Sequence, residues 1–441
     1  MEFKQLGLNP KILEALKIAN YSKATPIQEK AIGPILEGRD LIGLAQTGTG
    51  KTAAFALPML HLFAKKNIQR KVVRGLIITP TRELAIQIQR NFENYGAKLR
   101  LKSAVIFGGV KQGAQVRTLR SGVDILVATP GRLIDLVEQK HVDLSSVEVF
   151  VLDEADRMLD MGFIQDIRRI ISIVPEKKQT LLFSATMPKE VVRIVDTLLI
   201  NPIRVEVTPV SSTVETVKQS VYFVDDNHKI DILSEHLKAN PSSSVLVFTR
   251  TKHGADKVVK ELVKRKVLAQ AIHGNKSQNA RQTALENFKN YKTQVLVATD
   301  IASRGIDIHE LDYVINYDLP EVPETYVHRI GRTGRAGKSG TAISLCNYSD
   351  IDLLRDIEKL IKINIEELKN DEYPLVNKTK KVKSQRKNAS TKRRERSDSK
   401  TSKSTDSRTK KPQQDKPSSY RGKNKSKKST PSARTRNTRV K

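Results

Sequence analysis

The stretch Ala45-Gln46-Thr47-Gly48-Thr49-Gly50-Lys51-Thr52 carries the strongest structural signal in this chain of 441 residues. It follows a short apolar run at residues 41–44 and precedes a helical pattern at residues 53–62. A strand, a glycine-rich loop and a helix in this order form a cradle whose backbone N–H groups bind phosphate. Lys51 is then placed to contact the outer phosphates of a nucleotide such as ATP, and the Thr52 hydroxyl to bind Mg²⁺. Ala45 replaces the usual first glycine, and the alternative is an ordinary glycine-rich turn before a helix.

A second apolar run supports the phosphate-binding interpretation. Residues 149–152 predict a buried strand that ends in Asp153-Glu154-Ala155-Asp156. Asp153 is placed to hold Mg²⁺ through water, and Glu154 to orient or deprotonate an attacking water. The alternative is that these acids only complement the dipole of the next helix.

A basic run far along the chain offers positive charge for the transition state of phosphoryl transfer. The run is His328-Arg329-Ile330-Gly331-Arg332-Thr333-Gly334-Arg335. Arg332 and Arg335 are three residues apart, so they share one side of a helix or loop and could reach a nucleotide bound at Lys51. The alternative is a solvated basic turn.

Short apolar runs alternate with amphipathic stretches through residues 1–370, which predicts repeated strand and helix units. We therefore expect two α/β domains with parallel sheets, at residues 1–206 and 215–370, joined by a linker at 207–214. Two domains joined by one linker imply a cleft that can open and close. The predicted strands are residues 41–44, 76–79, 103–107, 125–128, 149–152 and 180–183 in the first domain, and 245–248, 269–272, 295–298, 313–316 and 341–345 in the second.

The charge of the chain is concentrated at its end. The formal net charge is +30, and residues 381–441 hold 23 Lys and Arg against 4 Asp and Glu, which is +19 of that total. These 61 residues contain no Leu, Ile, Phe, Met or Trp, so they cannot bury enough surface to offset chain entropy. We predict a disordered basic tail over 371–441 that binds a polyanion, most simply RNA, although a solubilising tail without a partner is the alternative.

The cysteine count and hydropathy limit where the protein works. A disulfide framework is excluded because the chain has one cysteine, Cys346, and no Cys/His cluster has the spacing of a zinc site. No apolar run approaches the length of a membrane span, and residues 1–6 lack an apolar signal core. We expect a cytoplasmic protein.

Taken together, the motifs resemble those of the DEAD-box ATP-dependent RNA helicases, in order from residue 3 to about residue 370. The opening segment and the basic tail are similar to the bacterial RhlE-type branch of that family. The resemblance implies two tandem RecA-like domains, ATP in the cleft between them and RNA across both. The motifs are Gln28, Ala45–Thr52, Pro80–Leu84, Gly108-Gly109, Thr129–Arg132, Asp153–Asp156, Ser184-Ala185-Thr186, Ala298–Asp300, Arg304–Asp307 and His328–Arg335.

The resemblance also implies roles for individual residues at the nucleotide. Residues 3–31 resemble the adenine-reading Q motif, in which Gln28 reads the base, Thr25 belongs to the same segment and Phe3 packs on the ring. An amide suits this role because it donates and accepts at once. Asp307 resembles the residue that contacts ribose. The residues implied to couple the nucleotide to RNA are Asp156, Ser184, Thr186, Asp300, Arg304 and His328.

Predicted RNA contacts follow strands or open helices, where backbone N–H groups can receive phosphate. Aromatic residues make up 5% of the chain and Trp is absent, so little base stacking is expected and binding should be largely independent of sequence. The preference for RNA over DNA is implied by the family alone. The predicted residues are Pro80, Thr81, Arg82, Gly108, Gly109, Thr129, Pro130, Gly131 and Arg132 in the first domain, and Thr249, Arg250, Gln278, Arg281 and Thr299 in the second.

The expected activity is ATP hydrolysis coupled to local unwinding of short RNA duplexes, with ribosome precursors or the RNA-decay machinery as candidate partners. Three other functions stay open from the sequence: an ATP-gated RNA clamp that unwinds little, a DNA translocase, and an RNA-binding protein without enzymatic activity. The last explains the charge but not the spacing of Lys51, Asp153, Glu154 and Arg335.

Overall fold

A computed structural model describes residues 1–46, 48–65, 72–207, 217–303, 308, 311–334 and 340–377. Six of the predicted features fall wholly or partly outside these residues. They are Thr47, Arg304, Asp307, Arg335, linker residues 208–214 and tail residues 378–441.

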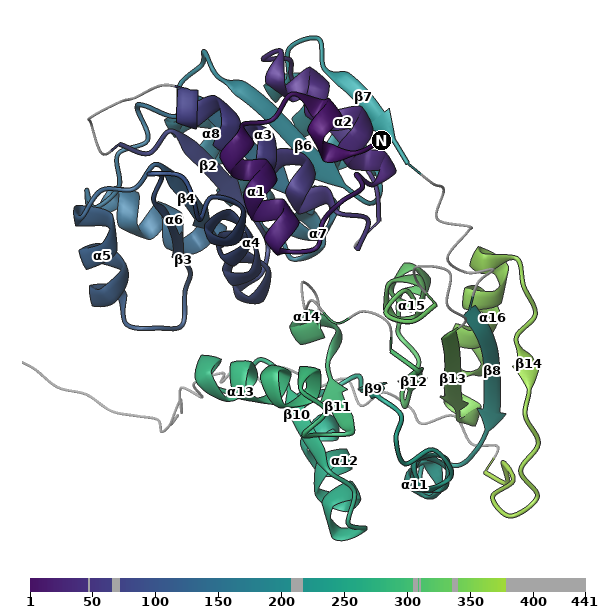
Figure 1. Cartoon of the computed structure of the whole chain (residues 1–441). Helices are drawn as coiled ribbons and strands as arrows, with labels where there is room; N and C mark the ends of the chain where they lie inside the picture. The colour runs from purple at the N-terminus through teal and green to yellow at the C-terminus, as the bar shows by residue number, and fades with distance from the viewer. Residues whose placement is uncertain are drawn as a thin grey trace, which may run out of the picture. The chain divides into compact units, whose positions relative to one another are not determined.

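The first domain is a parallel sheet with helices on both of its faces (Figure 1). Its strands occur in the order β3-β4-β2-β5-β6-β1-β7. Their bounds are β1 (Leu41–Leu44), β2 (Gly75–Ile78), β3 (Ser103–Ile106), β4 (Ile125–Ala128), β5 (Val149–Asp153), β6 (Gln179–Ser184) and β7 (Ile203–Glu206). The helices are η1 (Phe3–Leu6), α1 (Pro10–Ile18), α2 (Pro26–Leu36), α3 (Lys51–Lys65), α4 (Arg82–Tyr95), α5 (Gln112–Arg120), α6 (Pro130–Glu138), α7 (Ala155–Asp160), α8 (Ile164–Ile173) and α9 (Lys189–Leu198).

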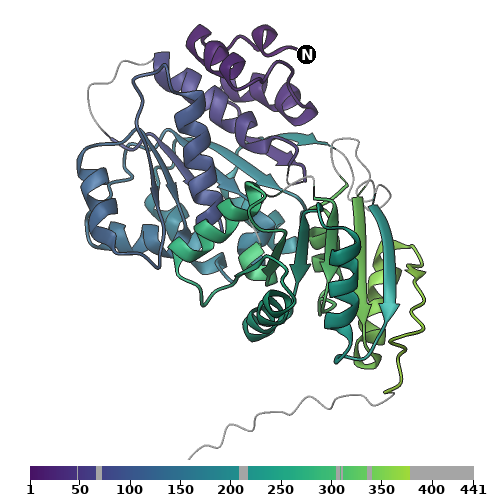
Figure 2. The same ribbon diagram turned by 60° about the horizontal axis from the view of Figure 1, so that its bottom comes forward.

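The second domain repeats this arrangement, with the strand order β10-β11-β9-β12-β13-β8-β14. The strands are β8 (Val217–Phe223), β9 (Val245–Phe248), β10 (Ala269–Ile272), β11 (Val295–Ala298), β12 (Tyr313–Asn316), β13 (Gly340–Cys346) and β14 (Glu366–Glu367). The helices are α11 (Lys229–Ala239), α12 (Lys252–Lys264), α13 (Gln278–Lys289), α14 (Asp300–Ser303), α15 (Pro323–Ile330), η2 (Tyr348–Asp350) and α16 (Ile351–Ile361). Figure 2 shows the sheets and their covering helices from a second direction.

The central strands are apolar along their whole length because both faces of each sheet are covered. In the first domain, one core cluster includes Phe55 and Val151 and lies on the side of α3, whereas the other includes Leu133 and Leu152 and lies on the side of α6. Adjacent residues of β5 thus point into opposite cores, as a pleated strand requires. The prediction of two tandem RecA-like α/β domains with parallel sheets is confirmed.

All strand pairs between named strands are parallel, so the carboxyl ends of the strands meet at one edge of each sheet. Loops at this edge are where α/β sheets bind ligands. Lys51 begins the helix after β1, Asp153 is the last residue of β5, and Thr186 lies in the loop after β6. The topology therefore gathers the predicted nucleotide residues at one edge.

Residues 371–377, the last that the structure describes, contact the second domain. The backbone N–H groups of Val376 and Asn377 donate to the Asp225 carboxylate at 3.2–3.3 Å, and the Tyr373 ring stacks on His228 with 5.2 Å between centroids. Residues 371–377 are therefore held against folded structure. The predicted tail at 371–441 therefore includes seven described residues, 371–377, and the rest of it lies outside the described residues.

Candidate nucleotide and RNA site

The glycine-rich loop is shaped by two residues that need the freedom of glycine. Gly48 and Gly50 have φ angles of 86° and 89°, a region that residues with a Cβ rarely adopt. A Cβ on Gly50 would also collide with the amide of Gln28. The chain can therefore turn sharply after Ala45 and begin α3 at Lys51.

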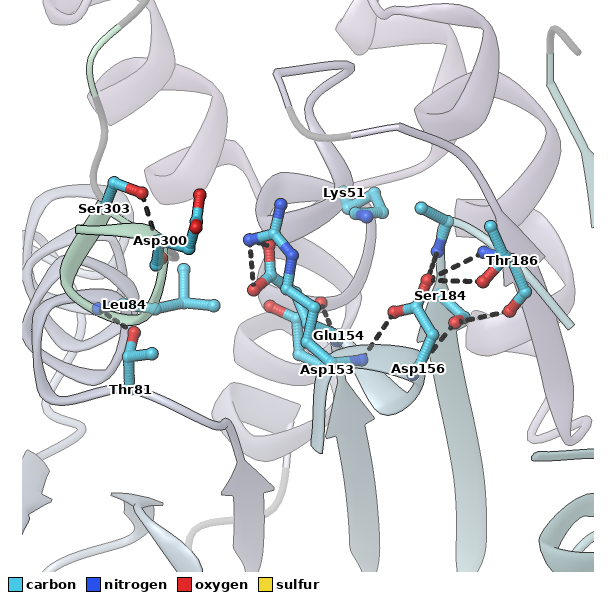
Figure 3. Close-up of polar contacts among 12 residues, drawn as sticks. Lys51, Thr81, Leu84, Asp153, Glu154, Asp156, Ser184, Thr186, Asp300 and Ser303 are labelled. Atoms are coloured by element: carbon cyan, nitrogen blue, oxygen red, sulfur yellow. Dashed lines mark hydrogen bonds and ion pairs between the residues drawn. The ribbon is translucent and has the colours of Figure 1, made fainter. Parts of the chain in front are cut away.

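Lys51 is buried, with 7% of its surface exposed, and its Nζ donates to the Ala45 carbonyl at 2.7 Å. The ammonium is thus held inside the loop that it closes. It lies beside the carboxylates that follow β5, as Figure 3 shows. A nucleotide phosphate would compete with the Ala45 carbonyl for this group.

Gln28 connects the predicted adenine-reading segment to the glycine loop. Its Oε1 accepts from the Thr25 backbone N–H at 2.9 Å, and its Nε2 donates to the Gly50 carbonyl at 3.1 Å. Both ends of the amide are therefore engaged by protein. Phe3 is 3% exposed and belongs to the apolar core of the first domain. The roles of Gln28 and Phe3 toward a base stay predictions.

Asp153 and Glu154 lie at the carboxyl end of β5, next to Lys51 (Figure 3). Burial raises the pKa of the Asp153 carboxyl to about 7, although the positive charge of Lys51 opposes the shift. A buried acid of this kind is costly unless a cation neutralises it. A cation bound beside Asp153 would therefore stabilise its ionised carboxylate.

Glu154 has an unusual backbone and a buried ion pair. Its φ and ψ angles are 55° and 51°, the left-handed region, which is strained for a residue with a Cβ. Both of its carboxylate oxygens lie 2.8 Å from Nη1 of Arg157. Sequence reasoning did not identify Arg157, although a separation of three residues placed it within reach of Glu154.

Asp156 joins the end of β5 to the end of β6. Its Oδ2 accepts from the backbone N–H groups of Ala185 and Thr186 at 3.2 and 2.9 Å and from the Thr186 hydroxyl at 2.9 Å. Ser184 Oγ accepts from the Asp156 backbone N–H and donates to the Thr186 carbonyl. Burial alone would raise the pKa of Asp156, but Lys51 and the Thr186 hydroxyl outweigh it and lower the pKa below its usual value.

The predicted RNA residues of the first domain lie in three neighbouring loops and at the starts of α4 and α6. The Arg82 guanidinium packs against Gly109, which has a φ of 77° and has no room for a Cβ. The Thr81 side chain caps α4 by accepting from the Leu84 N–H at 3.3 Å. Arg132, in the first turn of α6, donates to the side chain of Gln115 at 3.1 Å and to the Val110 carbonyl at 3.2 Å. The loops are thus braced by their own side chains.

Predicted RNA residues of the second domain are also bound by protein groups. Nη2 of Arg250 donates to the Leu319 carbonyl at 3.0 Å and to Asp350 at 2.9 Å. Gln278 and Arg281, on α13, contact the Glu83 carboxylate of α4 at 2.8 and 3.0 Å. Thr249 and Thr299 follow β9 and β11, at the carboxyl edge of the sheet. Phosphate would have to replace these carboxylates at Arg250 and Arg281.

A further buried arginine, which sequence reasoning did not assign a role, holds the carboxyl edge of the second sheet together. Arg329 is 1% exposed and binds both oxygens of Asp300, at 2.6 and 2.8 Å, and the Asp318 carbonyl at 2.6 Å. His328 precedes it in α15, and Arg332 follows the helix and is itself buried. Arg304, Asp307 and Arg335 lie outside the described residues.

The residues around Lys51 fit ATP with Mg²⁺. Mg²⁺ prefers oxygen ligands and usually keeps several waters while binding one or two carboxylates and the substrate phosphates. Asp153 and Thr52 offer such oxygens, and a cation bound there would offset the burial that raises the pKa of Asp153. No group of three or more metal-binding side chains occurs in the part of the chain that the structure describes. Within the same part of the chain, no helix is both long and apolar enough to cross a bilayer.

Two family models match the chain. Residues 25–194 match the DEAD/DEAH box helicase model, and residues 228–337 match the helicase conserved C-terminal domain. ATP-dependent RNA helicase CshA from Limosilactobacillus reuteri is 42% identical over 369 residues, which is 84% of this chain and 74% of that protein. DEAD-box ATP-dependent RNA helicase CshA from Streptococcus pneumoniae is 44% identical over 369 residues, which is 84% of this chain and 70% of that protein. These relatives carry the name CshA, so the RhlE-type assignment stays a prediction.

Solved structures match the same region. S. cerevisiae Dbp5 bound to RNA and ADP BeF3 gives a TM-score of 0.74 at 31% identity, covering 84% of this chain and 96% of that one. A DEAD box protein from Methanococcus jannaschii gives a TM-score of 0.51 at 39% identity, covering 84% of this chain and 99% of that one. The similarity therefore includes both domains.

Proposed function

Because the chain belongs to the family of DEAD-box ATP-dependent RNA helicases, we propose that it hydrolyses ATP at Lys51 and uses the ATP-bound state to unwind short RNA duplexes locally. The Dbp5 structure with RNA and ADP BeF3 supports ATP and RNA as the two ligands. One observation carries the proposal. Lys51, Asp153 and Glu154 lie beside a glycine loop at the carboxyl edge of the first sheet (Figure 3), where the charge of Lys51 acts on Asp153.

The residues of this site have complementary roles in hydrolysis. Water attacks the γ-phosphorus, the bond from that phosphorus to the bridging oxygen of ADP breaks, and the proton of the water passes to the Glu154 carboxylate. Lys51 stabilises negative charge on the outer phosphates. Asp153 and Thr52 would hold Mg²⁺, which when bound neutralises phosphate charge. Arg332 and Arg335 from the second domain would neutralise the transition state.

RNA would be gripped by its sugar-phosphate backbone. The predicted contacts lie at helix starts and loops, such as Thr81 before α4 and Thr129 before α6, where N–H groups can receive phosphate. Such contacts read the shape of the strand and its 2′-hydroxyl groups rather than base identity. Binding should therefore depend little on sequence.

ATP would act through a shift in populations before it is cleaved. If the two domains close on ATP and the closed surface accepts only a bent single strand, binding energy for that state separates a short duplex. Hydrolysis and phosphate release then return the open state. The bridge from Asp156 to Thr186 would link the nucleotide to this change, because it joins the strand that carries Asp153 to the next strand of the sheet.

The substitution Glu154→Gln tests the assignment of the base. It keeps the size of the side chain but removes the proton acceptor, so turnover should fall by about 10²–10⁴-fold. ATP-dependent retention on single-stranded RNA should persist for much longer than in the wild-type protein. Glu148→Gln, which alters an acid that pairs with Arg74 at 2.8 Å, is the control and should turn over normally. Normal turnover by Glu154→Gln would remove Glu154 from this role.

The basic tail would tether structured RNA through release of counterions, in a cytoplasmic setting that includes ribosome precursors or the RNA-decay machinery. Truncation after Lys380 should weaken RNA binding and flatten its dependence on salt while leaving ATP affinity unchanged. The measurement is RNA affinity across a salt series for both proteins. Equal affinity at low salt would eliminate the tether.

A further inference from the structure

The proposed base is engaged by a neighbouring arginine. Nη1 of Arg157 lies 2.8 Å from each oxygen of the Glu154 carboxylate, and the side chains of both residues are 5% exposed. A guanidinium is always charged and only donates. The contact is therefore a buried ion pair in which one nitrogen serves both carboxylate oxygens.

The ion pair between Arg157 and Glu154 opposes the proposed role of Glu154 as general base. A general base must offer a lone pair to the water that it deprotonates, at a distance of a hydrogen bond. Here both oxygens already accept from Arg157, and although each keeps a second lone pair, burial leaves little surface through which water could reach it. The arrangement describes a resting carboxylate.

The location of Arg157 suits control of this state. It lies in α7, the six-residue helix that directly follows Glu154, and its backbone N–H donates to Asp156 Oδ1 at 3.0 Å. The other oxygen of Asp156 is held by Thr186. A movement of the loop after β6 would therefore act on the same short helix that holds Arg157.

We infer that Arg157 is a positioning residue that holds Glu154 at rest, so that hydrolysis requires the carboxylate to exchange Arg157 for water. This inference rests on the proposed role of Glu154. The rate of hydrolysis without RNA is then proportional to the fraction of molecules in which the carboxylate is released. RNA raises the rate partly by increasing that fraction.

The test is steady-state ATP hydrolysis by full-length Arg157→Met, with and without saturating single-stranded RNA. Methionine keeps much of the apolar stem, whereas Glu154 loses a buried partner and is driven toward water. The rate without RNA should rise at least about threefold, in the range of measured couplings between contacting residues. The rate with saturating RNA should change less, so the stimulation ratio falls. Arg157→Lys retains a cation and should lie closer to the wild type.

A structural role for the pair predicts a different pattern. If Arg157 only stabilises the fold, or aims Glu154 productively, the rate without RNA stays constant or falls together with the RNA-stimulated rate, and the inference is overturned. Glu148→Gln disturbs the Arg74 pair elsewhere in the domain and should leave the ratio unchanged. If Arg157→Met does not fold, Arg157→Gln, which also removes the positive charge, decides, since an unchanged ratio and an unchanged rate without RNA in that folded variant overturn the inference.

A double substitution separates this inference from the function on which it rests. In the Glu154→Gln background, adding Arg157→Met should change nothing further in the rate without RNA, because the base is already absent. Turnover by Glu154→Gln at the normal rate would contradict the proposed function itself. Loss of turnover in Glu154→Gln with no rise in Arg157→Met would contradict only the role of Arg157.

Discussion

The two sheets share one strand order, yet the lysines that follow their first strands along the chain, β1 and β8, have different partners. Lys51 begins α3 after β1, and Lys229 begins α11 after β8. Nζ of Lys51 donates to the Ala45 carbonyl at 2.7 Å, whereas Nζ of Lys229 lies 3.4 Å from Asp226 and 3.5 Å from Asp318. The same fold thus supports one lysine near a phosphate cradle and another that is neutralised by its own domain.

The loops explain the difference. Gly48 and Gly50 make a sharp turn before Lys51, whereas the segment Val224-Asp225-Asp226 precedes Lys229 and supplies acids. Asp318 lies just beyond the end of β12, and its carboxylate also accepts from the Arg250 backbone N–H at 2.9 Å. Function therefore depends on loops placed on a shared scaffold.

Among the substitutions that compare the two domains, the largest effect is expected when Lys51 is removed. Lys51→Ala eliminates the charge that stabilises the outer phosphates, so ATP hydrolysis should fall by about 10²-fold or more and ATP-dependent unwinding should be abolished. The measurement is unwinding of a short RNA duplex with ATP. Retained unwinding would refute the role of the glycine loop.

Removal of the corresponding lysine should affect stability instead. Lys229→Met removes a buried cation from Asp226 and Asp318, whose carboxylates remain partly exposed to solvent, so the free energy of unfolding of the second domain should fall by about 1–3 kcal/mol. Urea denaturation measures this loss, and binding of a fluorescent ATP analogue should be unchanged. A marked loss of ATP affinity would show that the comparison between the two lysines is wrong.

A smaller effect is expected at the bridge between β5 and β6. Thr186→Val removes one hydrogen bond to Asp156, which costs about 1 kcal/mol and should lower unwinding more than ATP hydrolysis. Ser344→Ala is the matched control, because it removes the 3.3 Å bond from Asn316 that joins β12 to β13. It should leave the ratio of unwinding to hydrolysis unchanged. If the ratio of unwinding to ATP hydrolysis is the same in both variants, Thr186 does not couple the two activities.

Much of the fold could be predicted because buried parallel strands are continuous apolar runs. All eleven predicted strands are present, and β1, β4, β9, β10, β11 and β12 have the predicted bounds. The strands that were missed lack such runs. β7 alternates polar and apolar residues, β8 is rich in polar residues, and β14 has only two residues, Glu366 and Glu367. Pairing with a neighbour creates these strands, and one sequence does not reveal that pairing.

The parts of the site that could be predicted are those whose residues lie close together in the sequence. The loop around Lys51 and the acids after β5 are motifs with local spacing, and the structure brings them together. Arg329 and Lys229 were missed because Asp300 and Asp318, which they bind, lie 29 and 89 residues away in the sequence. Buried pairs of this kind become visible only when the topology places their elements together.

Hydrolysis is expected to depend above all on arginines of the second domain that complete the site in the first. The most direct measurement is RNA-stimulated ATP hydrolysis by a variant that combines Arg332→Ala and Arg335→Ala. Turnover should fall by about 10³-fold or more while a fluorescent ATP analogue still binds at Lys51, because the arginines act on the transition state. Unchanged RNA-stimulated turnover in that variant would contradict this central claim.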